Sequence, residues 1–297
     1  MIRPRASLLA HALSFALVGV GLAIAGGTGC SMLPERGRPL VPTRHQVRTG
    51  PFLVFSNFPL GEESEAIRSL VALERDFQER LGRPPSSAPR PVEIYVLDDH
   101  EAFTHFLKFY YPELPPRRAF FLARDQIRLV YTYSSPRLEE DLRHEATHAL
   151  LHGAYGDLPL WLDEGLAEYF ETDLAQPTLV RERAVRLLDD LAAGWTPSLT
   201  RLETLVDIHQ MTPRDYREAW AWVHLFLDGP PESRTSFASL IESRSRAGEL
   251  ASLADRLAKN GATNERMRDH VQALRTSLDA AVAKPEPTSW LPSFLRR

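Results

Sequence analysis

The run His144-Glu145-Ala146-Thr147-His148 has the form H-E-x-x-H, and its residue types are those of a hydrolytic metal site. On a helix, His144 and His148 lie one turn apart on the same face, so both imidazole rings can bind one metal ion. Glu145 then projects beside the rings, where its carboxylate can accept a proton from a water at the metal. The run therefore predicts a zinc site that activates water.

The sequence around this run has the pattern of an amphipathic helix. Pro136 can open the helix, and Gly153 and Gly156 offer places for it to end. Apolar residues recur between them at three- and four-residue spacing. These residues are Leu138, Leu142, Ala146, Ala149 and Leu150.

A second short helix is predicted over residues 160–170, directly after Pro159, and it carries Glu164 among apolar neighbours. A carboxylate in apolar surroundings needs a partner. Zinc hydrolases bind their ion through three protein ligands and leave a fourth position for water, and two His with one Glu form one of the recurring sets. We therefore expect Glu164 to be the third ligand of one Zn²⁺ per chain.

The run H-E-A-T-H followed by W-L-D-E-G-L-A-E-Y-F resembles the gluzincin metallopeptidases, the group that contains thermolysin and the zinc aminopeptidases. It is nearer still to the bacterial peptidase-MA-like families, whose second motif is W-L-x-E-G. The similarity covers Gln126 to Leu227. It implies that His144, His148 and Glu164 bind zinc and that Glu145 is the general base. The G-x-M-E-N sequence with which aminopeptidases recognise a free amine is missing, so the sequence gives no support for exopeptidase activity.

The resemblance also implies two supporting residues. Glu168, one turn after Glu164, matches an acidic residue that hydrogen-bonds a ligand histidine in many gluzincins. Tyr216 lies in a segment similar to the helix whose tyrosine donates a hydrogen bond to the oxyanion in the aminopeptidase branch. His209 and His224 are alternatives for that role. Tyr216 also fits a core-facing helical stripe and Glu168 an exposed charge, so these alternatives stay open.

The amino-terminal segment has the pattern of an export signal. Arg3 and Arg5 precede an uncharged stretch from Ala6 to Pro34, and Gly27-Thr28-Gly29-Cys30 resembles a bacterial lipoprotein cleavage box. We expect residues 1–29 to be a signal peptide, and a lipidated Cys30 to hold the catalytic part at the cell envelope, facing the periplasm or the exterior. An uncleaved membrane anchor is the alternative, because the stretch exceeds the ~20 residues that span a bilayer.

The remaining chain is predicted to form an α+β fold. We expect residues 30–50 to be a tether, residues 51–173 an α/β subdomain with the zinc site, residues 174–283 a mostly helical subdomain, and residues 284–297 a disordered tail. The first subdomain should contain a small mixed sheet with an edge strand beside the H-E-x-x-H helix, as in gluzincins. We assign the role of pairing with a substrate backbone to Ile127–Thr132.

Composition adds few constraints. A formal net charge of −4 and 43% hydrophobic residues are typical of a globular protein with a hydrophobic core. The chain has no run of basic residues that would indicate nucleic-acid binding. The resemblance to gluzincins implies a peptide or protein substrate, and the amino-terminal segment implies a membrane as a second partner. We predict zinc-dependent peptide-bond hydrolysis at the bacterial cell envelope. Two alternatives stay open: a catalytically inactive envelope lipoprotein that acts as a binding module, and a zinc enzyme that cuts a non-peptide amide.

Overall fold

The computed structural model describes residues 41–82, 90–124, 126–172, 177–231, 253–259 and 263–282, together with residues 233, 234, 237 and 241. The predicted signal peptide, Cys30, the first part of the tether and the predicted tail lie outside the described residues.

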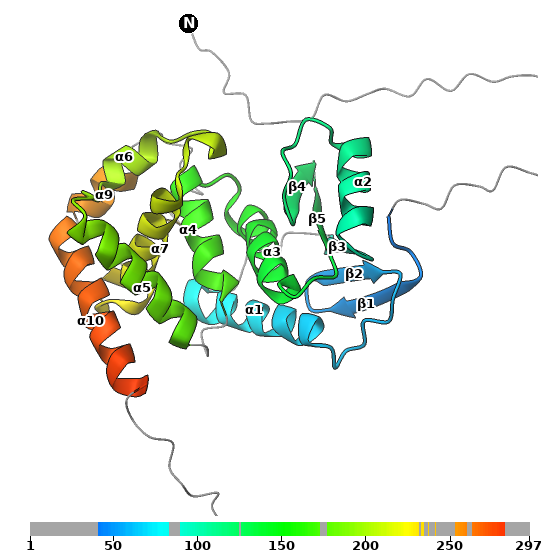
Figure 1. Cartoon of the computed structure of the whole chain (residues 1–297), viewed down its shortest axis with the longest axis horizontal. Helices are drawn as coiled ribbons and strands as arrows, with labels where there is room; N and C mark the ends of the chain where they lie inside the picture. Colours follow the sequence, from blue (N-terminus) through cyan, green and yellow to red (C-terminus); the bar gives the residue numbers. More distant parts are fainter. Residues whose placement is uncertain are drawn as a thin grey trace, which may run out of the picture. The chain divides into compact units, whose positions relative to one another are not determined.

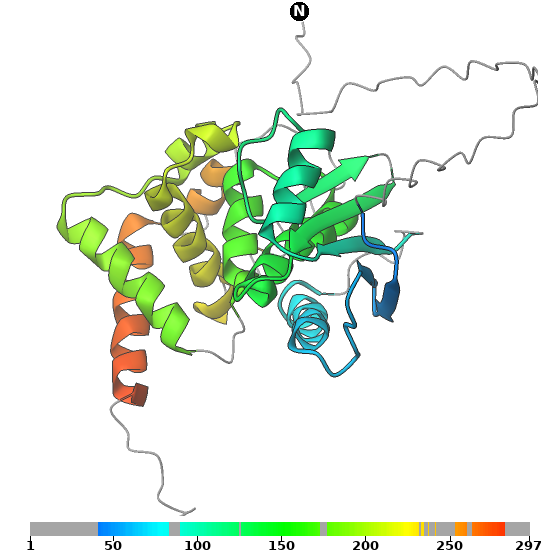
Figure 2. The same ribbon diagram turned by 45° about the vertical axis from the view of Figure 1, so that its right-hand side comes forward.

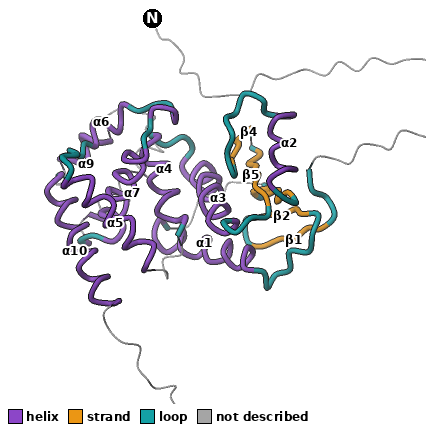
Figure 3. Tube along the Cα trace, viewed as in Figure 1, coloured by secondary structure: helices purple, strands orange, loops and turns teal. Residues whose placement is uncertain are grey.

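The strands form one mixed sheet of five strands in the order β1-β2-β3-β5-β4 (Figure 3). They are β1 (His45–Thr49), β2 (Phe52–Ser56), β3 (Val92–Leu97), β4 (Phe120–Arg124) and β5 (Ile127–Tyr133). The three central strands β2, β3 and β5 are parallel, whereas β1 and β4 pair antiparallel with their neighbours and lie at the two edges. The predicted α+β fold with a mixed sheet is confirmed at this level.

Three helices cover the two faces of the sheet (Figure 2). They are α1 (Glu65–Leu81), α2 (His100–Tyr110) and α3 (Leu138–Tyr155). On β5, the ring of Tyr131 packs against Phe106 of α2, whereas the guanidinium of Arg128 donates to the carbonyl oxygen of Ala149 on α3. Side chains of residues an odd number apart on a strand point to opposite faces, so α2 and α3 lie on opposite sides of β5. Helix α1 shares the α3 side, where both contribute to the main apolar core.

A layer of helices follows α3 in the chain and packs beside it (Figure 1). Helix α4 (Leu160–Glu171) lies between α3 and α7 (Pro213–Asp228), and the indole rings of Trp161, Trp220 and Trp222 are completely buried there or nearly so. Gly165 permits the close contact of α4 with α7, since a Cβ at this position would lie 2.8 Å from the carbonyl oxygen of Ala219. The other helices of this layer are α5 (Pro177–Ala192), α6 (Leu199–Thr204), the 3₁₀ helix η1 (Ile208–Gln210), α9 (Leu253–Lys259) and α10 (Asn264–Val282).

Two predictions about the strands are wrong. Strand β1 lies within residues 30–50, which the sequence predicts as a tether; its side chains are mostly exposed, so it has no apolar pattern, and pairing with β2 stabilises it. Strand β5, to which the sequence analysis assigns substrate pairing, is an interior strand whose two sides are occupied by β3 and β4. The edge strand beside α3 is β4.

Within the described ranges, none of the helices is both long enough and apolar enough to span a bilayer.

Candidate metal centre

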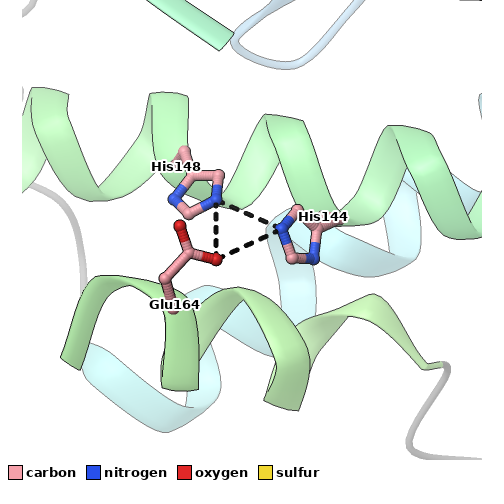
Figure 4. A group of neighbouring side chains, drawn as sticks. All are labelled: His144, His148 and Glu164. Carbon is pink, nitrogen blue, oxygen red and sulfur yellow. Dashed lines mark hydrogen bonds and ion pairs between the residues drawn. The ribbon is translucent and has the colours of Figure 1, made fainter. Parts of the chain in front are cut away.

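Three side chains from two neighbouring helices converge on one point (Figure 4). His144 and His148 come from α3, where their four-residue spacing puts both rings on the face that meets α4. Glu164 comes from the first part of α4 and is buried. The two Nε2 atoms lie 3.3 Å apart, and one carboxylate oxygen of Glu164 lies 3.7 Å from Nε2 of His144 and 3.9 Å from Nε2 of His148.

These separations fit a zinc ion. A triangle with such sides has its centre about 2.1 Å from each corner, and Zn–N and Zn–O bonds in proteins are about 2.0–2.2 Å long. The donor set of two imidazoles and one carboxylate is also one that zinc hydrolases use. The residues therefore fit the metal in both geometry and donor type.

Each histidine is oriented by a carboxylate on its other ring nitrogen. Nδ1 of His144 lies 2.9 Å from a carboxylate oxygen of Glu171, and Nδ1 of His148 lies 2.9 Å from a carboxylate oxygen of Asp163. A carboxylate there accepts the Nδ1 proton, which leaves the Nε2 lone pair free to bind a metal. Two Nε2 lone pairs and a carboxylate oxygen that face one another would repel, so this arrangement is suited to a bound cation.

The sequence-based role of Glu168 is wrong, because the partner of His144 is Glu171. Glu168 instead forms an ion pair with Arg183 of α5 at 2.8 Å. Arg183 also donates to the second carboxylate oxygen of Glu171 at 2.9 Å. His144, Glu168 and Glu171 have ligand atoms within 4.8 Å of one another, but the guanidinium of Arg183 already forms ion pairs with both acids. We interpret this group as support for His144 and not as a second metal site.

The site is strongly negative, and this shows in the pKa values of its groups. Burial opposes protonation of His148, but Asp163 and Glu164 outweigh burial and raise its pKa to about 9. Burial likewise opposes protonation of His144, yet its hydrogen bonds with Glu164 and Glu171 hold its pKa well above the ordinary value. A site that favours positive charge on both imidazoles also favours a divalent cation between them.

Glu145 lies beside His144, His148 and Glu164 and lines an open pocket together with them. Burial raises the pKa of Glu145, although the two histidines act in the opposite direction. A raised pKa brings a carboxylate closer to the range in which a general base works at neutral pH. The other residues that line this pocket are Arg117, Phe121, His144, His148, Asp163, Glu164, Ile208 and Tyr216.

Tyr216 is the predicted oxyanion donor that the structure brings to this pocket. It lies in the first turn of α7 and is half-buried, and burial together with Glu164 and Glu168 raises the pKa of its hydroxyl, which therefore keeps its proton. Of the two alternatives, His209 is exposed on η1 and does not line the pocket. His224 is buried elsewhere, with Nδ1 2.9 Å from Nε2 of His270.

Three functional residues were missed from the sequence. Asp163 directly precedes Glu164, and Glu171 lies two helical turns after it, so helical spacing could have indicated both as acids near α3. Arg117 lies in the loop before β4 and has no local sequence signal.

Buried Arg143 fixes the two metal-site helices to each other. Its guanidinium donates to the carbonyl oxygen of Phe170 at 2.6 Å and to the carboxylate of Asp76 on α1 at 2.9 Å. Phe170 directly precedes Glu171, and Arg143 directly precedes His144. Arg143, next to His144, thus holds the end of α4 that carries Glu171, the partner of His144.

No protein-family model matches this chain, and no curated protein matches it at a significant level. The chemistry of the pocket must therefore be inferred from its own geometry.

Proposed function

We propose that this protein is a zinc-dependent metallopeptidase of the gluzincin, peptidase-MA-like type that hydrolyses peptide bonds at the bacterial cell envelope. One observation carries the proposal: the Nε2 atoms of His144 and His148 and a carboxylate oxygen of Glu164 lie within 3.9 Å of one another, and Glu145 lines the same pocket. The order and the residue types of the two sequence motifs, H-E-A-T-H and W-L-D-E-G, support the same peptidase type.

Zinc bound to His144, His148 and Glu164 would supply Lewis-acid chemistry, which polarises the scissile carbonyl and acidifies the attacking water. The carboxylate of Glu145 would accept the proton of that water and pass it to the leaving amine. The hydroxyl of Tyr216 would donate a hydrogen bond to the oxyanion that develops on the carbonyl. Asp163 and Glu171 would keep both imidazoles in the tautomer that the reaction needs.

The edge of the sheet offers a place for the substrate backbone. On its outer side β4 has no neighbouring strand among the described residues, and its Phe121 lines the pocket with a ring centroid 6.4 Å from that of His148. A peptide that paired with this edge would pass beside the ligands with its backbone held by main-chain hydrogen bonds. We therefore move the proposed substrate strand from β5 to the outer edge of β4.

Two measurements on the full chain test this function. Elemental analysis of the purified protein should give about one zinc per chain, and mass spectrometry of a diverse peptide pool should show new cleavage products. Glu145→Gln should retain the zinc and lose cleavage, because it removes the base and leaves the three ligands. Glu139→Gln, the same change on α3 outside the pocket, should leave both unchanged.

The same experiment separates the two alternatives. Zinc binding without any peptide cleavage, in the wild type as in Glu145→Gln, would favour the inactive binding module and would contradict the proposed function. The intact carboxylate of Glu145 argues against that module, since a protein that only binds has no need of a general base. Hydrolysis of small amides without cleavage of any peptide would favour the non-peptide alternative.

The envelope location is a proposal that depends on the export-like segment and Cys30. Two or more acyl chains on Cys30 would hold the catalytic part on a membrane. The full-length protein should therefore enter the detergent phase on detergent partitioning, and Cys30→Ala should enter the aqueous phase. If Cys30→Ala stays in the detergent phase, an uncleaved anchor replaces the lipid in this proposal.

A further inference from the structure

Arg117 is the one lysine or arginine among the described residues that line the candidate metal site. It lies in the loop between α2 and β4, three residues before Phe120, and it is half-buried. Glu145, Glu164 and Tyr216 line the same pocket. A permanent positive charge therefore borders the place where the scissile bond would lie.

The loop that carries Arg117 is fixed to α3 by the next residue, Arg118. The guanidinium of Arg118 binds the carboxylate of Asp141 at 2.7 Å, and the carbonyl oxygen of Arg118 accepts a hydrogen bond from Thr132 at 3.4 Å. Asp141 lies on α3, three residues before His144. Arg118 thus anchors the loop, and Arg117 is held in position at the pocket.

Arg117 itself forms no ion pair with a carboxylate of the described part of the chain. Among the described residues no acid lies within ion-pair distance of it, and its Nε donates to the carbonyl oxygen of Pro115 at 3.4 Å. The neighbouring arginines differ in this respect: Arg118, Arg143 and Arg183 each bind an acidic side chain. The terminal nitrogens of Arg117 therefore remain available to a ligand.

We propose that Arg117 binds a carboxylate of the substrate close to the peptide bond that is cut, so that the enzyme prefers peptides with an acidic group at this position. The inference rests on the proposed peptidase function. A guanidinium forms two parallel hydrogen bonds with a carboxylate, which fixes both position and orientation. If Arg117 were absent, such a carboxylate would be repelled by the three acids that line the pocket, Glu145, Asp163 and Glu164. The carboxylate could belong to an Asp or Glu side chain or to the C-terminus of the substrate.

Matched peptides test the proposal and distinguish the two sources. One peptide that the wild type cleaves is made with Glu or Gln at each position flanking the cut bond, and with a free or an amidated C-terminus. We expect kcat/KM to be higher by about tenfold or more for the member that presents the carboxylate to Arg117, as expected for a charge-assisted pair. Preference in the Glu–Gln pair identifies a side chain, and preference in the free–amidated pair identifies the C-terminus.

The protein variants make the assignment specific to Arg117. Arg117→Gln should abolish the preference, Arg117→Lys should retain part of it, and Arg124→Gln, at the exposed end of β4, should retain all of it. Melting temperature and zinc content should be unchanged in all three. If Arg117→Gln slows every peptide equally, or if wild type shows no preference, the proposal is overturned.

Binding without turnover separates this proposal from the proposed function. Glu145→Gln loaded with zinc should bind the fluorescently labelled carboxylate peptides more tightly than their amide counterparts, and Arg117→Gln in that background should remove the difference. If no peptide is cleaved by wild type, the labelled set is the same flanking-residue and C-terminal series built on an alanine peptide. Carboxylate-dependent binding without cleavage would contradict the peptidase function alone. Cleavage without carboxylate-dependent binding would contradict the role of Arg117 alone.

Discussion

Nδ1 of His144 and a carboxylate oxygen of Glu171 lie 2.9 Å apart, at the point where α3 meets the last turn of α4. His148 has the equivalent contact with Asp163, at the first turn of α4. The earlier histidine of α3 contacts the later acid of α4, and the later histidine contacts the earlier acid. Helix α3 thus supplies both imidazoles, and α4 supplies both carboxylates that orient them. The third ligand, Glu164, lies between these two acids in the sequence.

Removing either orienting carboxylate should weaken zinc binding. Glu171→Gln and Asp163→Asn keep the size of the side chain and remove its charge, so Nδ1 of the paired histidine loses its strong acceptor. We expect the dissociation constant for zinc to rise by about 10- to 100-fold in each variant. Titration with a competing chelator measures this constant directly.

Asp157→Asn is the matched control, because it removes one acid from the exposed loop between α3 and α4. It should leave zinc affinity unchanged. Equal weakening in Asp157→Asn would mean that net charge near the site matters and that the specific contacts of Glu171 and Asp163 do not.

The hydroxyl of Tyr216 should act in the chemical step and not in zinc binding. Tyr216→Phe removes only the oxygen, and loss of one oxyanion donor costs about 10²–10³ in kcat. We expect kcat to fall by this factor, KM to change little and zinc content to stay the same. Tyr110→Phe, the same change at an exposed position on α2, is the control. An unchanged kcat in Tyr216→Phe would leave Tyr216 as a packing residue of α7.

The pairing of a substrate with β4 can be tested from the substrate side. N-methylation of one backbone amide removes a hydrogen-bond donor and adds bulk, so a peptide bound as an added strand tolerates it only at alternate positions. We expect kcat/KM to alternate between high and low when the methyl group is moved along the peptide. A smooth dependence on position would contradict strand pairing.

Much of the local structure could be predicted from the sequence, because periodicity is a local property. The helix predicted over residues 160–170 is α4, Leu160–Glu171. Spacing within the two motifs also brought His144, His148 and Glu164 onto facing helices. These features depend on residues within a few turns of one another.

The errors concern contacts between distant segments. The order of strands in a sheet is not visible in the sequence. The sequence analysis therefore assigns substrate pairing to β5, but in the structure β4 lies between β5 and the edge of the sheet. The role of Glu168 follows from its place in the motif that resembles gluzincins, but the acid that contacts His144 depends on how α4 packs and on Arg183 from α5. The polar strand β1 is held in the sheet by pairing with β2, a contact that its own sequence does not reveal.

Gly165 should be needed to keep Glu164 in place. A Cβ at this position would lie 2.8 Å from the carbonyl oxygen of Ala219 and 3.0 Å from a methyl group of Val223, so α4 and α7 would have to separate. Gly165→Ala should lower the free energy of unfolding by about 1–3 kcal/mol. Zinc affinity should fall with it, because Glu164 is the adjacent residue. Urea denaturation and zinc titration measure the two effects, and Gly61→Ala, where a Cβ has no atom within 4 Å, is the control.

His224 should make the fold less stable in mild acid. Burial lowers the pKa of His224 to about 4, an effect that Asp228 only partly opposes, and His270 beside it also favours the neutral form. The ordinary pKa is 6.5, so between these two values the unfolded chain binds a proton that the folded chain does not. Stability should be complete above pH 6.5 and fall towards pH 4, by at most about 3 kcal/mol for this group.

The groups around His224 explain why the folded protein excludes the proton. Nδ1 faces His270 of α10, while Asp228 is already bound by Arg80 of α1 and by the hydroxyl of Tyr169 on α4. Urea denaturation at pH 7 and pH 5 measures the loss of stability, which should be smaller in His224→Gln than in wild type. His209→Gln, at an exposed histidine, should behave as wild type does. An equal loss in wild type and His224→Gln would assign the acid sensitivity to other groups.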